Sequence, residues 1–489
     1  MQRIFAGAAG VVFAVTITGA ATAADLSAPI FKAPPLQTYN WSGFYAGLGL
    51  GYGAYNLSGT QIDDPAAGVP PAFIFAEGTS GGAGWLATAQ VGFDYQIAPA
   101  WVVGAFANWD WTDISGTHVG MLTVGTGNLT QKWAWAAGGR IGYLATPQLL
   151  TYVTGGYTQA HFGGLDYDVA FAPGTPLGVS LPSQTYDGWF VGAGVEYMIA
   201  PGWFAKGEYR YADYGSRILS NVDTATGALI GTAERLHPIV QSVRAGLSYK
   251  FNWGGGVPAA ASAPIFASPA PAGWSGIYAG LGGGYGSFNV DGVQVTDPAV
   301  APPSVFVNDQ LTSGGSGAFA TAQIGVDYQF APTWVAGVFA DWDWTDLDGR
   351  HVGFVNTGFG NLQQRWAWAA GGRLGYLVTP RVLTYVSGGY TQTRFSGVDY
   401  ESTFAPGVPL DIAVRAQTYN GWFVGAGVEY MIAPGWFAKA EYRYADYGSK
   451  IVSDIDTGFG GALTGLAERL RPSTQTIRTE LVYKFNWGG

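Results

Sequence analysis

Histidines are the side chains of this 489-residue chain best suited to acid–base or metal chemistry near pH 7. The four are His118, His161, His237 and His351. A hydrolase would need one of them beside an Asp or a Ser. Only His118 and His351 recur at corresponding positions in two similar halves of the chain, and both fall in long polar segments. We therefore expect surface residues, and we predict no catalytic, metal-binding or cofactor-binding residue and no enzymatic activity.

Three short motifs are formally similar to known signatures, and each fails in its context. GTSGG at 78–82 matches G-x-S-x-G, but the second half has Leu311 in place of the first glycine. DWDWTDLDG at 341–349 has the acids of a calcium loop without its spacing. GLGLGYG at 47–53 has Gly at every second residue, which is typical of the small face of a strand rather than of a phosphate-binding loop.

Charged residues at alternating positions of apolar segments are stronger candidates for a site. Lys206, Glu208 and Arg210, for example, alternate with apolar neighbours. Charges of both signs inside a narrow β-barrel should pair, because an unpaired charge away from water is costly. We predict either a structural plug of ion pairs or a switchable gating network. Its residues are Asp94, Asp110, Lys132, Arg140, Glu196, Lys206, Glu208, Arg210 and Arg244 in the first half, and Asp327, Asp343, Arg365, Arg373, Glu429, Lys439, Glu441, Arg443 and Arg478 in the second.

The composition favours a membrane protein built from strands. Only 11% of the residues are charged, 15% are aromatic, and there are 76 glycines and no cysteine. Soluble globular proteins have roughly 25% charged residues. The net charge of −10 argues against a nucleic-acid partner.

The N-terminus is typical of an exported protein. Arg3 precedes an uncharged run that ends in small residues, which predicts a cleaved signal peptide at 1–24 rather than an N-terminal anchor. A periplasmic extension at 25–40 would follow. No later apolar run reaches the roughly 20 residues of a membrane helix, so membrane residence requires a barrel.

The chain contains one long unit twice. KWAWAAGGRIGYL at Lys132 returns as RWAWAAGGRLGYL at Arg365, an offset of 233 residues. SAPIF at 27–31 recurs at 262–266 in a segment rich in Pro, Ala and Gly. We predict barrel units at 41–253 and 273–489, joined by a linker at 254–272.

Period-two alternation predicts eight strands in each unit. In the first unit they lie near 43–56, 84–97, 101–115, 129–145, 149–162, 186–199, 203–214 and 238–253. Each exceeds the roughly 9–11 residues that a tilted strand needs to cross a bilayer. Short and long connections alternate, and tryptophans near the strand ends suit interfacial girdles. The predicted fold is all-β, a transmembrane antiparallel up-and-down barrel.

Two such units could form two eight-stranded barrels or fuse into one sixteen-stranded barrel. Each unit keeps its own closing strand, with alternating aromatic residues, and the linker is far longer than the tight turns. Both features favour two barrels. The predicted closing and assembly signature consists of Tyr249, Phe251, Trp253, Tyr483, Phe485 and Trp487.

The opening NWSGFYAGLGLGYG, the hairpin GVEYMIAPGWFAKGEYRYADYGS and the closing LSYKFNW resemble the small outer-membrane "porin family" proteins of alphaproteobacteria. These are relatives of the eight-stranded OmpA/OmpX-type barrels. The resemblance covers nearly all of both units. It implies an outer-membrane location, contact with lipid and lipopolysaccharide, and insertion by the barrel-assembly machinery with periplasmic chaperones. The family commonly ends on an aromatic residue, whereas Gly488 and Gly489 follow Trp487 here.

The sequence therefore predicts an outer-membrane protein with a structural, envelope-integrity and surface-display role and a lumen filled by ion pairs. A passive diffusion porin for small hydrophilic solutes is the first alternative, because a sixteen-stranded barrel would leave an aqueous channel. A surface adhesin acting through the long loops is the second.

Overall fold

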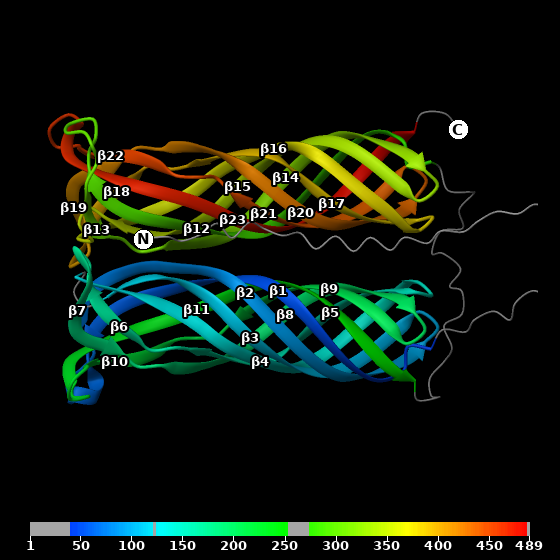
Figure 1. The fold of residues 1–489 in the computed structure, drawn as a ribbon, viewed down its shortest axis with the longest axis horizontal. Coiled ribbons are helices and arrows are strands. Elements are labelled where there is room, and N and C mark those ends of the chain that lie inside the picture. The colour runs from blue at the N-terminus through cyan, green and yellow to red at the C-terminus, as the bar shows by residue number, and fades with distance from the viewer. Residues whose placement is uncertain (1–39, 121–123, 253–272, 487–489) are drawn as a thin grey trace, which may run out of the picture. The chain divides into compact units, whose positions relative to one another are not determined.

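The computed structural model describes residues 40–120, 124–252 and 273–486 (Figure 1). The predicted signal peptide, most of the extension at 25–40, the linker, Trp253 and Trp487 lie outside the described residues. Within the described part of the chain, no helix is long and apolar enough to cross a membrane.

The first half of the chain closes into an antiparallel ring of eight strands, coloured blue to green in Figure 1. In order around the ring they are β1 (Gly43–Asp63), β2 (Phe73–Ala98), β3 (Trp101–Gly120), β4 (Gly125–Thr146), β5 (Leu149–Phe162), β8 (Gln184–Ala200), β9 (Trp203–Asp213) and β11 (Leu229–Asn252). The last strand pairs with the first, and Phe44 faces Phe251 across this seam. We call this ring barrel 1.

The second half forms its own ring, barrel 2, coloured green to red. Its strands are β12 (Gly276–Thr296), β14 (Ser313–Ala331), β15 (Trp334–Gly353), β16 (Gly358–Thr379), β17 (Val382–Phe395), β20 (Gln417–Ala433), β21 (Trp436–Asp446) and β23 (Ala462–Asn486). Ile277 faces Phe485 where β12 closes on β23. The prediction of two eight-stranded barrels is confirmed. The sixteen-stranded alternative is wrong, because β11 already pairs with β1 and leaves no edge for fusion.

Tight turns join strands at one end of each barrel, the short-turn end, and longer connections lie at the other, the long-loop end (Figure 1). The longer connections contain a 3₁₀ turn, η1 (Pro65–Ala67), and the short strands β6 (Leu165–Val169), β7 (Ala172–Leu181), β10 (Arg217–Asp223), β13 (Phe306–Asp309), β18 (Val398–Ser402), β19 (Ala405–Val414) and β22 (Lys450–Asp456). Several pair with ring strands, as β10 does with β11.

An apolar band surrounds each barrel between two aromatic girdles. Trp101 packs on Tyr143 near the short turns, and Trp109 stacks on Trp133 farther along the strands. Between them Leu48 is 71% exposed and points outward. The ten residue steps from Trp101 to Trp111 span about 25 Å along the axis of a barrel with tilted strands, which is the height of an outer-membrane apolar band.

The ring strands continue well past this band, which the sequence prediction missed. β1 runs to Asp63 rather than to residue 56, and β11 begins at Leu229 rather than at residue 238. Tyr55, at the end of the predicted strand, and Leu57, just beyond it, point into the barrel and are fully buried. Beyond the bilayer, water surrounds the barrel and an apolar core fills it. The apolar residues of each strand therefore point inward there, whereas within the bilayer they point outward. A search for apolar residues on the outer face therefore ended the strands too early.

Candidate functional site in the barrel lumens

A buried ion cluster crosses the lumen of barrel 1 near the short turns. Arg140 on β4 donates to Asp94 on β2 (Nε–Oδ1 2.8 Å) and to Glu196 on β8 (Nη1–Oε2 2.7 Å). Lys250 on β11 lies 2.7 Å from Asp94 Oδ2, with the rings of Trp41 and Phe204 against its ammonium group. Four strands are thus joined across the interior, at a height that lies within the apolar band.

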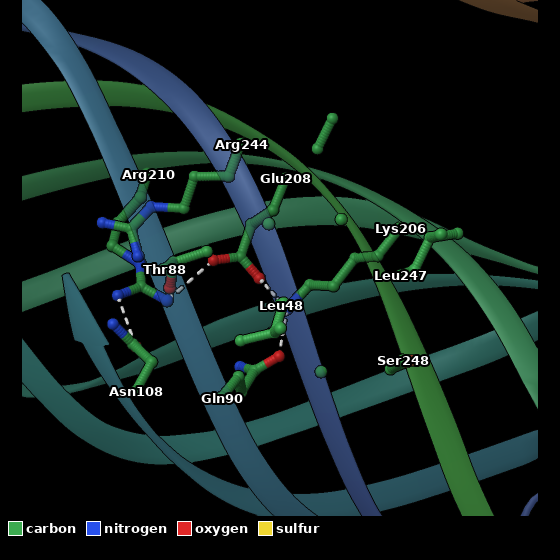
Figure 2. A pocket seen from close by; sticks show the side chains of 14 residues that line it. Leu48, Thr88, Gln90, Asn108, Lys206, Glu208, Arg210, Arg244, Leu247 and Ser248 are labelled. Carbon is green, nitrogen blue, oxygen red and sulfur yellow. Dashed lines mark hydrogen bonds and ion pairs between the residues drawn. The ribbon is translucent and has the colours of Figure 1, made fainter. Parts of the chain in front are cut away.

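A second network fills the middle of barrel 1 (Figure 2). Glu208 accepts from Lys206 at 2.9 Å and from Arg210 at 2.7 Å, and Arg210 also donates to Asn108 at 2.9 Å. On another side, Arg244 pairs with Asp110 at 2.9 Å. A cavity of about 30 Å³ lies among these side chains, and inward-facing glycines such as Gly47 and Gly246 line part of it. This volume holds about one or two water molecules.

Barrel 2 repeats both networks with more carboxylates. Arg373 joins Asp327 and Glu429, and Lys484 lies 2.7 Å from Asp327. This cluster repeats the one near the short turns of barrel 1. In the middle, Arg443 pairs with Asp341 at 2.8 Å and with Glu441 at 2.9 Å. Arg478 pairs with Asp343 at 2.9 Å, and Lys439 with Glu480 at 3.2 Å. The structure therefore brings together sixteen of the eighteen predicted network residues in two lumens.

Lys132 and Arg365 are the two exceptions, and their predicted inward positions are wrong. Both side chains are exposed. On β4, Gln131 and Trp133 have partners on each neighbouring strand, whereas Lys132 has none, and Arg365 on β16 has the same position. Each is therefore the extra residue of a β-bulge, which turns its side chain away from the phase set by the rest of the strand.

Sequence reasoning left four network residues out of the predicted set: Lys250, Lys484, Asp341 and Glu480. The two lysines alternate with the closing aromatics, and the structure buries them inside the barrels. Asp341 was considered only as part of a failed calcium motif. The inward phase of β23 is the signal that would have identified Glu480.

His118 and His351 are buried rather than exposed, so the expectation of surface histidines is wrong for this pair. His118 Nδ1 lies 2.7 Å from Ser80 Oγ, and its Nε2 lies 3.0 Å from Glu234 Oε2. Ser313, His351 and Glu468 repeat the arrangement in barrel 2. The residues lie past the aromatic girdle, in strand extensions that the sequence prediction treated as loops.

The Ser–His–Glu order is that of a catalytic relay, and Ser80 is the serine of the GTSGG motif. The barrel 2 copy leaves little room for a substrate. Both Ser313 and His351 are buried, and the cavity beside His351 and Glu468 measures about 10 Å³, which is room for about one water molecule. An acyl substrate would need far more space.

Barrel 2 carries one further acid near this group. Asp454 on β22, outside the membrane-spanning strands, accepts from Gln294 Nε2 at 2.7 Å. Burial, followed by the negative charge of Glu468, raises the pKa of Asp454 to about 9. Asp454 is therefore protonated at neutral pH.

A closed barrel with an apolar band, aromatic girdles and a charged interior defines a small outer-membrane protein. The outer membrane protein beta-barrel domain family matches residues 23–251 and again 259–485, so the chain belongs to this family in two tandem copies.

Its curated relatives come from Brucella. The 31 kDa outer-membrane immunogenic protein of Brucella melitensis is 29% identical over 265 residues, which cover 51% of this chain and 100% of the relative. The 25 kDa outer-membrane immunogenic protein of Brucella abortus is 27% identical over 221 residues, which cover 41% of this chain and 91% of the relative. The predicted outer-membrane location and the alphaproteobacterial resemblance are thereby confirmed.

Solved structures match at low similarity. A Pseudomonas aeruginosa FadL homologue is 12% identical, covers 91% of both chains and has a TM-score of 0.26. Ail, the attachment invasion locus protein of Yersinia pestis, is also 12% identical, covers 42% of this chain and 98% of its own, and has a TM-score of 0.21.

Proposed function

We propose that this outer-membrane protein is a non-conducting structural element whose two barrels are filled by ion pairs and display their long-loop ends at the cell surface. The observation that carries the proposal is the buried ion cluster near the short turns, which we call the base cluster and which is present in both barrels. Arg140 and Arg373 each join carboxylates from two other strands across the lumen. An eight-stranded barrel is just wide enough to be filled by its side chains.

Conductance of the refolded full-length chain in planar bilayers tests this proposal. We expect no stable channel, because ion flow would require the buried pairs to separate. A sixteen-stranded porin in the same bilayers is the positive control. Large, long-lived conductance steps from the folded protein would overturn the proposal and favour the passive-diffusion alternative.

The strand extensions support surface display. β2 begins with Phe73, twelve residues before Trp85 of the girdle, so an ordered wall projects past the bilayer. We propose that this wall and its connections meet lipopolysaccharide and the exterior, and that insertion uses the barrel-assembly machinery. Antibodies against the segment 64–72 should bind intact cells. Binding only after permeabilisation would place this end in the periplasm.

A further inference from the structure

Two glutamates and a histidine meet inside barrel 1 at its long-loop end. Glu77 on β2, His118 on β3 and Glu234 on β11 each offer one ligand atom, and these atoms lie within 4.8 Å of one another. All three side chains are at most 1% exposed. Glu77 lies eight residues beyond Trp85, so the cluster is about 20 Å past the girdle and outside the apolar band.

A β-bulge aims Glu77 at this point. Gly59 faces Gly78 and Thr60 faces Ala76, which leaves Glu77 as the extra residue of β2. Gly78 has a φ of +78°, a conformation that favours glycine. A Cβ atom on Gly59 would lie 2.2 Å from Glu77 Oε2, so a glycine opposite the bulge leaves the room that the carboxylate occupies.

Neighbouring hydroxyls orient the other two side chains. Ser80 Oγ lies 2.7 Å from His118 Nδ1, and the Tyr167 hydroxyl donates to Glu234 Oε1 at 2.5 Å. These contacts leave His118 Nε2 and Glu234 Oε2, 3.0 Å apart, to face the same point. Outer partners of this kind fix metal ligands in proteins, with Nδ1–H donating and Nε2 free to coordinate.

Glu77 supplies the observation that points to a ligand, because neither of its carboxylate oxygens has a hydrogen-bond partner. Two buried carboxylates this close need a proton or a cation between them. A proton on Glu77 would still leave its hydroxyl without an acceptor, whereas a divalent cation would satisfy both glutamates and neutralise their charge.

We infer that Glu77, His118 and Glu234 form a binding site for one first-row divalent cation, for which Zn²⁺ is the best match. Imidazole and carboxylate ligands at about 2.0–2.2 Å, with water in a fourth position, are a common zinc environment. Coordination would replace the hydrogen bond between His118 and Glu234. Because the residues are buried, the metal enters during folding or through local opening of the long-loop end.

Barrel 2 provides a natural comparison within the same chain. His351 and Glu468 keep the contact at 2.8 Å, and Tyr400 donates to Glu468 at 2.6 Å. Gln310 stands where barrel 1 has Glu77, because the two positions differ by the repeat offset of 233. An uncharged amide supplies a poorer ligand, so we expect one bound metal per chain rather than two.

The test is to refold the full chain in detergent with Zn²⁺, desalt it and measure the bound metal by mass spectrometry. We expect one equivalent in the wild type and none in Glu77→Gln, with an affinity loss of at least about a hundredfold by chelator competition. Heat-modifiable migration in gels confirms folding of the variant, which is isosteric with the wild type.

The double variant His161→Gln/His237→Gln is the matched control, because it removes the two histidines of barrel 1 that lie outside the cluster. It should keep the full equivalent, and Co²⁺ in place of Zn²⁺ should give a visible absorption band that Glu77→Gln lacks. A wild type that binds no metal, an unchanged equivalent in Glu77→Gln, or its loss in the histidine control would each overturn the inference.

Discussion

The two lumens share one set of cations but differ in their anions. The charge network of barrel 1 contains five cations, Arg140, Lys206, Arg210, Arg244 and Lys250, against four carboxylates, Asp94, Asp110, Glu196 and Glu208. Barrel 2 contains Arg373, Lys439, Arg443, Arg478 and Lys484 against Asp327, Asp341, Asp343, Glu429, Glu441 and Glu480. The formal charge is thus +1 in the first network and −1 in the second.

Two positions account for this difference. Asn108 and Gly246 of barrel 1 correspond to Asp341 and Glu480 of barrel 2. The cavity of about 30 Å³ in barrel 1 borders both Asn108 and Gly246. The comparison shows that the five cations occupy corresponding positions in both barrels. The number of carboxylates can differ, provided that each carboxylate lies close enough to a cation to form an ion pair. The extra carboxylates also occupy volume.

The largest effect is expected where the barrels agree. Asp94→Ala and Asp327→Ala each remove the carboxylate shared by an Arg and a Lys, leaving excess buried positive charge. We expect each to cost its own barrel about 3–5 kcal/mol. The chain has no cysteine, so a single labelled cysteine in either barrel can report its urea unfolding separately. A large loss in one barrel alone would contradict the equivalence of the two base clusters.

The next effect addresses the position where the barrels differ. Glu480→Gly should destabilise barrel 2 by about 1.5–3 kcal/mol, because Lys439 loses the nearer of its two carboxylates, which lies at 3.2 Å, while Glu441 remains at 3.5 Å. The reciprocal Gly246→Glu places a carboxylate near Lys206 and the cavity, but its Cβ would lie 2.7 Å from the Leu48 carbonyl oxygen. We therefore expect it to destabilise barrel 1, by less than Glu480→Gly destabilises barrel 2. Urea unfolding of both labelled variants measures the pair. Equal destabilisation by the two changes would show that position 246 is not simply an unfilled copy of position 480.

Asp454 gives a smaller, pH-dependent effect. Its pKa is raised to about 9, so the stability associated with its protonated form is complete below about pH 4 and declines as pH rises toward 9. Asp454→Asn restores the residue of barrel 1, Asn221, and should flatten this decline and stabilise barrel 2 by about 1–2 kcal/mol at pH 8. Urea midpoints between pH 4 and 9 test it, and identical slopes in both proteins would contradict it.

The smallest effect is expected at the surface. Asp187 pairs with Arg217 at 2.5 Å in barrel 1, and both side chains are nearly half exposed. Barrel 2 has Asn420 in place of Asp187. Asp187→Asn should change the stability of barrel 1 by less than about 1 kcal/mol, and less still in high salt. A larger loss in the same unfolding assay would mean that this pair is less solvated than its exposure indicates.

Much of the fold could be predicted from the sequence because membrane barrels alternate strictly. Leu48 and Leu50 outside, with glycines between them inside, already give strand and orientation. The rule that apolar residues lie on the outer face failed where the barrel leaves the lipid. Past the girdle water replaces lipid, so Leu57 turns inward and the pattern no longer matches a membrane strand.

The site was predictable to the extent that it follows the same alternation. Lys206, Glu208 and Arg210 lie on the inner face as their phase indicates, whereas the bulge at Lys132 changes the phase by one residue without a local signal. His118 on β3 and Glu234 on β11 are far apart in sequence, and they meet inside the barrel only because the ring closes with β1 and β2 between these two strands. No spacing motif records such a meeting.

The self-closed seams at β1–β11 and β12–β23 have a consequence for how this kind of chain can change. At these seams each unit pairs its own last strand with its first, so neither ring has an open edge that needs a strand of the other unit. Each ring can therefore close without a strand from the other copy. One copy can therefore acquire different lumen residues while the other copy keeps its own. Positions 246 and 480, which are Gly in one copy and Glu in the other, are an example.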